Sequence, residues 1–403
     1  MNKNLFKDAN QIIDFSINAS LPNVKKALNN FSKPKGRTIM IAIGKAAYTM
    51  ASETISQIDI DEGLVITKYS HLKSSLKNTT IIEAGHPILD ENSLLATSKT
   101  IQMCSNLTKD DVILFLISGG GSSLFELPLI NLDKLQAINK QLINCGASIN
   151  EINIIRNRLS KVKGGKFAKL CEPAKIINII LSDVIGDSLN IIASGPTNID
   201  PSTPNDALKV IKKYNLNLDN EILELLQHDT IKELNNVENH IIGNNDLLVE
   251  SAKTKAKFLG YQVIPTKQHL TCDINEAVLY FSSFLNNTNK SNSKVCIIIG
   301  GEISINVKGN GLGGRNQEFA CRMAPLLINT NACFFALGSD GTDGPTNAAG
   351  GYVDKDSYDS SIDSYLKSND SYHYLEKNNG LIITGPTLTN VCDLYCLLIN
   401  NLD

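Results

Sequence analysis

The sequence lacks the cysteine patterns that build disulfide frameworks and zinc sites. Its nine cysteines are an odd number, and they are scattered without a C-x-x-C pair. Disulfide-rich scaffolds and zinc-binding modules need closely spaced cysteines. Cys392 and Cys396 lie one helical turn apart, but the apolar residues around them favour packing over metal binding. We therefore expect neither disulfide bonds nor a cysteine-ligated metal.

Long apolar runs and basic clusters are also missing. Residues 1–20 lack the unbroken apolar core of a secretory signal, and no later run is long enough to span a bilayer. The formal net charge is only −3, and no run of basic residues coincides with aromatic side chains. Partners such as nucleic acid and anionic membranes select basic surfaces. The sequence predicts a cytoplasmic protein that binds neither.

The patterns of covalent hydrolases are absent as well. Neither G-x-S-x-G nor a cysteine with a plausible histidine partner is present. With 403 residues the chain is long enough for two domains. The stretch from Asp206 to Asn239 is rich in Asn, Leu, Lys and Glu and lacks glycine, so we place the crossover there. The expected domains are residues 1–236 and 237–403.

What the sequence does contain is a series of glycine-dense loops, of which residues 300–318 are the densest. Glycines at 309, 311, 313 and 314 lead directly into Arg315 and a predicted helix. Glycine permits close backbone approach, so several N–H groups, the helix dipole and a guanidinium could meet one anion. The same letters match G-x-G-x-x-G, which would mark a dinucleotide site only inside a parallel βαβ unit. Residues 294–310 instead resemble a hairpin.

A second loop of this kind follows the first predicted strand. Residues 38–44 predict a buried strand that turns through Gly44 into a helix, with Lys45 in its first turn. A helix start attracts anions, and a lysine there adds a positive charge. The segment is not a Walker A loop, because the upstream glycine and the following Ser or Thr are missing. The alternative is a lysine that is merely solvated.

A third loop, Ser118 to Ser123, follows the apolar strand 111–117. Three consecutive glycines, Gly119, Gly120 and Gly121, cost backbone entropy that an inert turn would not require. Ligands bind at the carboxyl ends of strands in open parallel sheets, so this loop is predicted to hold an anionic group. His86, which follows another strand, could orient a substrate carboxylate or simply bond a backbone carbonyl.

Charged residues near residue 160 form the densest cationic patch. Predicted helices over 131–145 and 149–160 lead to it, and it includes Arg156 and Lys163. The usual role of such a run is a solvated helix face. The interspersed glycines make a clamp for a substrate anion the alternative.

Two aspartate-bearing loops follow buried strands. Asp183 and Asp187 come after the strand 175–181, and Asp340 and Asp343 come after the strand 332–338. Such pairs suit Mg²⁺ ligation or proton abstraction. Ordinary Asx turns are the alternative.

The remaining segments complete the expected fold. Residues 239–265 predict one βαβ unit, and residues 380–400 predict a strand, a Gly-Pro turn and a final apolar helix. Strands that end in Gly, Ser, Thr and Asp loops, with Lys45 and Arg315 as cations, suit phosphoryl transfer. That reaction depends on positioning and on neutralising charge.

The chain resembles the glycerate 2-kinase family with a C-terminal MOFRL domain. The resemblance runs from about Ile41 to the C-terminus. It rests on AIGKAAYTM, EAGHPILD, SGGGSSL, LSKVKGGKFA, LSDVIGD, ASGPT, GLGGRNQE, ALGSDGTDGPTNAAGG and TGPTLTNV, in this order.

This resemblance implies an α/β fold: an N-terminal Rossmann-like α/β/α sandwich, a smaller C-terminal α/β domain with the MOFRL region at about 294–400, and a site between them. It implies phosphorylation of D-glycerate on its 2-hydroxyl by ATP with Mg²⁺. A homodimer is one assembly that the sequence allows. A nicotinamide-dependent hydroxypyruvate reductase and a non-catalytic sensor are the alternative functions.

The resemblance also assigns roles to single residues. Lys45 and Arg315 would be the catalytic cations, with Asp183 as base or metal ligand. The remaining expected sites are as follows: nucleotide or anion binding at Ser118, Gly119, Gly120, Gly121, Ser122, Gly311, Gly313 and Gly314; substrate binding at His86, Arg156, Lys163 and Asn316; metal binding at Asp183, Asp187, Asp340 and Asp343.

Overall fold

The structure is a computed structural model that describes residues 2–72, 74–288 and 293–402. It divides into two compact units. We call Pro22–Ile242 the six-strand domain, and the rest of the chain, up to Leu21 and from Gly243 onward, the seven-strand domain. No helix within these residues combines the length and the apolar character needed to cross a membrane.

The first helix, α1 (Lys3–Ala19), belongs to the seven-strand domain, whereas the expected division assigned residues 1–236 to one domain. The reason is its apolar face, on which Leu5, Ile12 and Ile13 are buried. This face packs on α11 (Asn245–Phe258), β10 (Ala332–Gly338) and β13 (Asp393–Asn400) of the seven-strand domain. Such a long-range docking has no local signal, because an amphipathic helix only shows that it needs some apolar partner.

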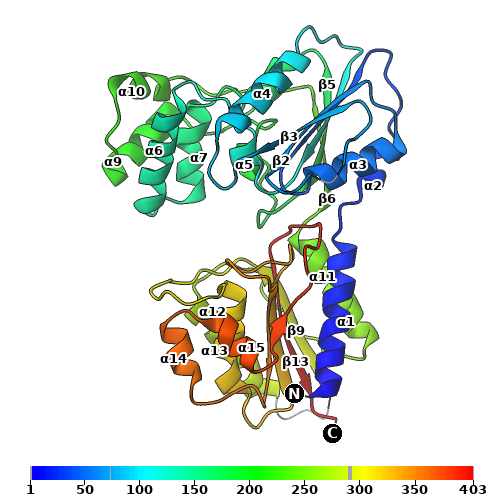
Figure 1. The fold of residues 1–403 in the computed structure, drawn as a ribbon, viewed down its shortest axis with the longest axis vertical. Helices are drawn as coiled ribbons and strands as arrows, with labels where there is room; N and C mark the ends of the chain where they lie inside the picture. The colour runs from blue at the N-terminus through cyan, green and yellow to red at the C-terminus, as the bar shows by residue number, and fades with distance from the viewer. Residues whose placement is uncertain (1, 73, 289–292, 403) are drawn as a thin grey trace. The chain divides into compact units, whose positions relative to one another are not determined.

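The six-strand domain is built on a sheet in the order β3-β2-β1-β4-β5-β6, and β1 pairs in parallel with both β2 and β4. This is the strand order of the Rossmann fold, so the expected N-terminal architecture is confirmed. Strands β2, β3, β5 and β6 of this sheet are labelled in Figure 1. The elements are α2 (Val24–Leu28), β1 (Thr38–Ile43), α3 (Ala47–Gln57), β2 (Glu62–Lys68), β3 (Thr79–Ala84), α4 (Glu91–Met103), β4 (Val112–Ile117), α5 (Gly121–Leu124), α6 (Leu132–Asn144), α7 (Ile149–Arg158), α8 (Lys166–Leu170), β5 (Lys175–Leu181), η1 (Ile192–Ser194), α9 (Pro204–Tyr214), α10 (Asn220–Leu226) and β6 (Val237–Gly243).

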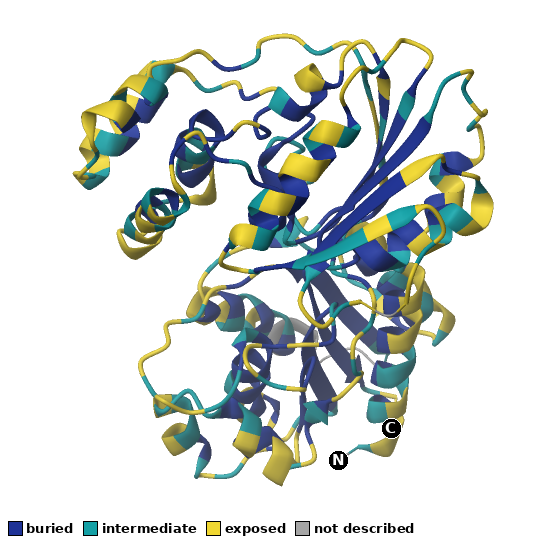
Figure 2. Ribbon diagram, turned by 45° about the horizontal axis from the view of Figure 1, so that its top comes forward, coloured by how far each residue is buried: buried dark blue, intermediate teal, exposed yellow. Residues whose placement is uncertain are grey.

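The central strands β1 and β4 of this sheet are apolar and almost entirely buried, because both faces of the sheet are covered there. Ile41 belongs to one apolar cluster with residues of α4 and α8, while its neighbour Met40, on the opposite face, is also fully buried. Helix α3 packs on β1 and β2. Parallel sheets are normally buried on both faces in this way. Figure 2 shows most of the sheet in dark blue, and the edge strands β3 and β6 also contain intermediate and exposed residues.

The seven-strand domain has a mixed sheet in the order β12-β11-β10-β13-β9-β7, with β8 also paired to β9. Strand β13 is antiparallel to both β9 and β10. The elements after α1 are α11 (Asn245–Phe258), β7 (Gln262–Val263), β8 (His269–Leu270), α12 (Ile274–Thr288), β9 (Lys294–Gly301), α13 (Arg315–Met323), η2 (Ala324–Leu327), β10 (Ala332–Gly338), β11 (Gly350–Asp354), α14 (Ile362–Lys367), α15 (Ser371–Lys377), β12 (Leu381–Ile382) and β13 (Asp393–Asn400).

The expected final helix is wrong, because Asp393–Asn400 forms β13 in the middle of the sheet. All eight of its residues are buried, so both faces of this mainly apolar strand are covered. An apolar run without alternation does not distinguish a central strand from a buried helix. Cys392 and Cys396 are therefore not one helical turn apart, and both are buried and outside any disulfide bond.

Two further expectations at the domain crossover and before Arg315 are wrong. The predicted βαβ unit over 239–265 is divided, because β6 lies in one sheet and β7 in the other. The predicted hairpin over 294–310 is also absent from the described residues. After β9, residues 302–314 form only the isolated bridge between Asp273 and Ser304. The coil cannot pair with β9 as a hairpin strand, because both edges of β9 are already occupied, one by β13 and the other by β7 and β8.

Candidate functional site

The loops after β1 and β4 meet at the point where the strand order of the six-strand domain reverses. The N–H of Lys45 donates to the carbonyl of Gly119 at 2.8 Å, and the N–H of Ala46 donates to Ser118 Oγ at 3.0 Å. Helix α3 begins at Ala47, so Lys45 lies in the preceding turn rather than in the first helical turn. In open α/β sheets, ligands bind at this reversal, outside the carboxyl ends of the strands.

The glycine loop after β4 offers backbone donors. Gly120 has a φ of +88°, which favours glycine. Within residues 2–72, 74–288 and 293–402, the N–H groups of Gly119, Gly120, Gly121 and Ser122 have no hydrogen-bond partner. Consecutive N–H groups without partners form a concavity that binds anions. This loop therefore retains the donors that the sequence predicted for it.

Two histidines lie beside these loops. Nδ1 of His86 is 2.9 Å from Ser123 Oγ, and a Cβ on Gly120 would come within 3.1 Å of the His86 ring. Burial lowers the pKa of His86 to about 4, and the positive charges of Lys45 and Lys68 add to this effect. At neutral pH the ring is uncharged, so it can orient a ligand by hydrogen bonding but adds no charge. His71 Nδ1 lies 3.1 Å from the Lys45 carbonyl.

Asp183 and Asp187 follow β5, the neighbour of β4 in the sheet. Both are half-buried, and Asp187 has a positive φ of 54°. The topology thus brings the Lys45 turn, the glycine loop and the Asp183 loop to the carboxyl edges of three adjacent strands. The sequence predicted that each of these loops follows a buried strand, and the sheet order adds that the three strands are adjacent.

A buried chain of hydroxyl and amide groups lies behind the glycine loop. Ser194 Oγ lies 3.0 Å from Ser122 Oγ and donates to Asn153 Oδ1 at 3.0 Å. Ala193 and Ser194 have φ of 51° and 60°, a backbone conformation that costs non-glycine residues energy. Such strain persists only where the surrounding structure fixes it, so this segment is held rigidly against the loop.

The cationic patch is less exposed than the sequence suggested. The Arg156 guanidinium donates from Nε to Asn139 Oδ1 at 2.7 Å, and burial lowers its pKa. The Lys163 side chain is fully buried, and its ammonium lies 3.0 Å from Glu126 Oε2. Lys163 therefore faces the protein interior rather than a solvent-borne anion, which differs from the expected substrate clamp.

In the seven-strand domain, Arg315 is the first residue of α13, as expected. Its Nε and Nη2 donate to the two carboxylate oxygens of Asp393 at 2.6 and 3.1 Å, and Nη1 donates to Glu302 Oε1 at 2.6 Å. Burial lowers the pKa of Arg315, but Asp393 and Glu302 outweigh burial and raise it. The guanidinium is therefore charged and fixed in direction by a bidentate contact.

The glycine loop before Arg315 is largely committed to internal partners. The N–H of Gly309 donates to Asn369 Oδ1 at 2.9 Å, that of Gly311 to the Ser368 carbonyl at 2.8 Å, and that of Leu312 to Asp370 Oδ1 at 2.9 Å. A Cβ on Gly311 would come within 2.5 Å of Asp370 Cβ. These glycines allow close packing against residues 368–370.

Asp343 occupies the N-terminus of α13. Its carboxylate accepts from the N–H of Asn316 at 3.1 Å and of Gln317 at 2.8 Å, and a Cβ on Gly314 would collide with it. Burial raises the pKa of Asp343 to about 6, against the lowering by these N–H groups. The positive end of the α13 dipole, which we expected to bind a ligand, is thus capped by the Asp343 carboxylate.

Asn316 and Asp340 also contact this segment and its neighbour. Asn316 is buried, and its Nδ2 donates to Asp343 Oδ1 at 3.2 Å, so the side chain faces the cap and not a substrate. Asp340 Oδ1 accepts from the N–H and the hydroxyl of Thr342 at 3.0 and 2.9 Å, which is an Asx turn. Gly314 lies beside the Asp343 carboxylate, where a second anion would be repelled, and Gly313 lies against Ser371.

Two carboxylates with structural importance were missed by the sequence analysis. Asp393 is fully buried beneath Arg315, and Glu126 is buried beside Lys163. Both stand as single acids within apolar runs, LTNVCDLYCLL and SSLFELPLI. A buried acid needs a cationic or hydrogen-bonding partner, so a lone acid in such a run was a usable signal.

The fit of Mg²⁺ differs between the two aspartate loops. Mg²⁺ is usually held by one or two carboxylates together with substrate phosphates and water. Asp183 and Asp187 are half-buried and follow a strand that ends beside the glycine loop, so they suit this chemistry. Asp343 suits it less, because its oxygens already accept backbone N–H groups. Within the described residues no three His, Cys, Asp or Glu side chains cluster as metal ligands.

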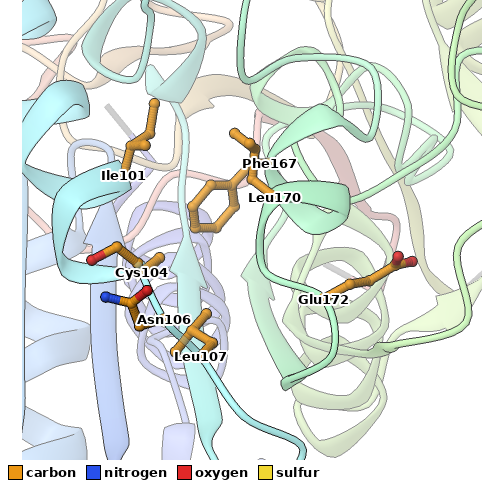
Figure 3. Close-up of a pocket in the computed structure, with 8 residues that line it drawn as sticks. Ile101, Cys104, Asn106, Leu107, Phe167, Leu170 and Glu172 are labelled. Carbon is orange, nitrogen blue, oxygen red and sulfur yellow. The ribbon is translucent and has the colours of Figure 1, made fainter.

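A separate pocket of about 340 Å³ lies elsewhere in the six-strand domain (Figure 3). Ile101, Cys104 and Leu107 line it together with Phe167 and Leu170. The lining is mainly apolar and contains none of the site residues predicted from the sequence. We therefore assign it to imperfect packing between α4 and α8.

The strand order and the loops at the sheet edge are typical of α/β enzymes that bind phosphate-bearing small molecules. Two family models match the chain: the domain of unknown function DUF4147 over residues 8–227 and the MOFRL family over residues 295–393. D-glycerate 2-kinase of Thermotoga maritima is 42% identical, with the alignment covering 98% of this chain and 99% of that protein. The chain therefore belongs to the glycerate 2-kinase family.

Two further comparisons agree with this assignment. Glycerate 2-kinase of Pyrococcus horikoshii is 36% identical, over 91% of this chain and 88% of that protein. A crystal structure of glycerate kinase from Thermotoga maritima matches with a TM-score of 0.90 at 41% identity, covering 98% of this chain and 100% of that chain. The expected family and the C-terminal MOFRL domain are thus confirmed.

Proposed function

We propose that the chain is an ATP-dependent kinase that phosphorylates D-glycerate on its 2-hydroxyl, giving 2-phosphoglycerate and ADP. Glycerate kinases similar over almost the full length support the reaction. Within this chain, the main supporting observation is the contact between the Lys45 turn and the glycine loop 118–123. The N–H groups of Gly119 to Ser122 in this loop have no hydrogen-bond partner within the described residues. Phosphoryl transfer needs such donors beside a cation.

In this proposal, the N–H groups of Gly119 to Ser122 bind an anionic group of ATP or of glycerate. Lys45 adds its positive charge at the same edge of the sheet. His86 is neutral at pH 7, so it orients the ligand through a hydrogen bond. Donors that are fixed before the reaction stabilise charge without reorganising, which is the main source of rate enhancement in such sites.

Arg315 is the second proposed catalytic cation. The bidentate contact with the buried Asp393 fixes the direction of the guanidinium. Its third contact, from Nη1 to Glu302, involves a side chain that is about half exposed. We propose that this exposed side of the guanidinium neutralises the transferring phosphoryl group, as arginine does in other phosphotransferases.

Asp183 is the proposed base or Mg²⁺ ligand, with Asp187 beside it. Mg²⁺, when bound, would neutralise phosphate charge, and these half-buried carboxylates fit it better than Asp343 does. Asp183 would then accept hydrogen bonds or the proton of the glycerate hydroxyl. A metal role for Asp340, a homodimer and a cytoplasmic location stay predictions.

The alternative of a nicotinamide-dependent reductase has less structural support. The G-x-G-x-x-G at Gly309 to Gly314 comes after β9, which pairs antiparallel with β13, and the long coil 302–314 separates β9 from α13. A dinucleotide fingerprint instead requires a tight turn from a strand into a helix within a parallel βαβ unit. The third alternative, a sensor without catalysis, predicts binding without turnover.

The experiment is a direct assay of the pure full-length protein. It is incubated with D-glycerate, ATP and Mg²⁺, and ³¹P NMR identifies the product. We expect 2-phosphoglycerate in equal amount to ADP. A parallel incubation with hydroxypyruvate and NADH should leave the NADH intact. NADH oxidation without ADP formation would support the reductase, and tight binding of ATP without either product would support the sensor.

A further inference from the structure

We propose that Lys163 is a positioning residue: its buried ammonium holds the glycine loop after β4 in the conformation that presents its N–H groups to the substrate anion. The proposal rests on the proposed function and deepens it. It replaces the expected role of Lys163 as a direct substrate ligand.

The contacts of the ammonium are complete. Lys163 Nζ donates to the carbonyl of Ser122 at 2.6 Å and to the carbonyl of Phe125 at 3.0 Å, and it lies 3.0 Å from Glu126 Oε2. An ammonium has three N–H donors, so each has a partner. The Lys163 side chain has a relative exposure of 0%, which leaves no surface for a ligand.

Both carbonyls belong to the short helix α5 and the residue that follows it. A helix of four residues has too few internal hydrogen bonds to be stable alone. Its carbonyls point toward its C-terminal end and its first N–H groups point the opposite way. A cation that binds the carbonyls therefore fixes the direction of the N–H groups of Gly119 to Ser122 at the other end.

The segment that carries Lys163 is itself anchored to the strained segment behind the loop. The N–H of Gly164 donates to the Ser194 carbonyl at 3.1 Å, and that of Gly165 donates to the Gly195 carbonyl at 2.8 Å. Ser194 Oγ in turn meets Ser122 Oγ at 3.0 Å. The glycine loop, the Lys163 turn and residues 194–195 thus form a closed set of contacts.

Stability alone does not account for a buried ion pair at this place. Desolvation of Lys163 and Glu126 costs about as much as their attraction gains, and apolar pairs of similar size are often at least as stable. Ser160 Oγ donates to the other oxygen of Glu126 at 2.5 Å, so the acid is held by a second contact. The Lys163–Glu126 pair is neutral overall, so it orients the backbone of the glycine loop but adds no net charge to the site.

The test compares Lys163→Met with the double variant Lys163→Met/Glu126→Gln. The single variant leaves a buried carboxylate unpaired and should unfold at lower temperature, whereas the double variant removes that charge and should regain most of the loss. The control is Lys161→Met, which removes an exposed lysine two residues away. For each protein we measure the melting temperature, KM and kcat for ATP and D-glycerate, and amide hydrogen exchange over residues 118–125.

We expect the double variant to melt near the wild type. Its KM for at least one substrate should still rise about tenfold or more, because the N–H groups are no longer aligned. Exchange over residues 118–125 should be about tenfold faster or more, while α12 exchanges as in the wild type. Lys161→Met should match the wild type in all readouts. Wild-type KM and wild-type exchange in the double variant would overturn the proposal.

Glu126→Gln alone provides a milder variant if the others fail to fold. It keeps both carbonyl contacts of the ammonium, so residues 118–125 should exchange at the wild-type rate. Faster exchange there would show that Glu126, and not Lys163, holds the loop. Exchange needs no substrate, so it tests the positioning role even in a protein without kinase activity. A wild type without kinase activity would overturn only the proposed function.

Discussion

The two glycine loops, residues 118–123 and 309–314, have similar sequences but different surroundings. The first lies beside the Lys45 turn, and its N–H groups from Gly119 to Ser122 have no partner within the described residues. The second lies beside Asp343 and Asp370, and several of its N–H groups donate to residues 368–370. The first therefore resembles an anion site, and the second a packed support for Arg315.

This difference shows what glycine content can and cannot indicate. A glycine-rich turn allows backbone to approach something closely, but the sequence does not say what. At Gly311 it is the chain itself, since a Cβ there would come within 2.5 Å of Asp370 Cβ. At Gly120 the nearest group is the ring of His86, whose pKa is lowered in part by the positive charges of Lys45 and Lys68. The neighbouring charges distinguish the two cases.

The largest predicted effect concerns the two proposed catalytic cations: Lys45, which lies beside the first loop, and Arg315, which follows the second. Lys45→Ala and Arg315→Ala should each lower kcat on the order of a hundredfold or more, because each removes charge stabilisation of the transferring group. The controls are Lys77→Ala and Arg322→Ala, which remove an exposed and a half-buried cation. Steady-state assays of ADP release measure the effect. Wild-type kcat in Lys45→Ala would remove that lysine from the mechanism.

The next prediction is that Asp343 of the seven-strand domain contributes to stability, whereas Asp183 of the six-strand domain contributes to catalysis. Asp343→Ala should lower the free energy of unfolding by about 1–3 kcal/mol, since it leaves the buried N–H groups of Asn316 and Gln317 without an acceptor. Asp183→Ala should instead lower kcat and leave the melting temperature almost unchanged. Chemical denaturation and kinetics on both variants measure this. Loss of Mg²⁺ dependence in Asp343→Ala without loss of stability would contradict the capping role.

A smaller effect is the opposite response of the two domains to pH. The pKa of His86 is lowered to about 4 in the folded protein, so its contribution to stability rises as pH increases from about 4 to 6.5. The pKa of Asp343 is raised to about 6, so its contribution falls as pH increases from about 3.8 to 6.

Melting temperatures between pH 4.5 and 7 test this pair. Relative to the wild type, His86→Gln should flatten the gain in stability with rising pH, and Asp343→Asn should steepen it. His228→Gln, which changes an exposed histidine, is the control. Parallel pH profiles for His86→Gln and the wild type would show that this ring is not held neutral by burial.

Much of the fold could be predicted because its signals are local. The predicted strands 38–44 and 111–117 are apolar runs that lead into glycine-containing turns, and both are confirmed as β1 and β4. Helices α6 and α7 match the predicted spans 131–145 and 149–160 within two residues. Strand β13 could not be predicted, because a run buried on both faces carries no periodicity. The docking of α1 depends on partners more than two hundred residues away.

The candidate site could be predicted only in part for a similar reason. The Lys45 turn and the Ser118 loop were each predicted to follow a buried strand, and both strands are confirmed. Only the structure shows that the two loops meet. Which members of a charged run are buried depends on tertiary packing. Lys163 was therefore predicted as a substrate ligand, although its ammonium is bound to carbonyls and to Glu126.

Adding one negative charge to each glycine loop tests which of the two loops binds an anion. Ser122→Asp and Asn310→Asp place a carboxylate in the first and the second loop, and calorimetric titration of full-length protein measures the Kd for ATP and for D-glycerate. We predict that Ser122→Asp weakens binding of at least one of them about tenfold or more through repulsion at short range, and that Asn310→Asp leaves both within about twofold. Weakened binding in Asn310→Asp together with wild-type binding in Ser122→Asp would contradict the assignment of the anion site.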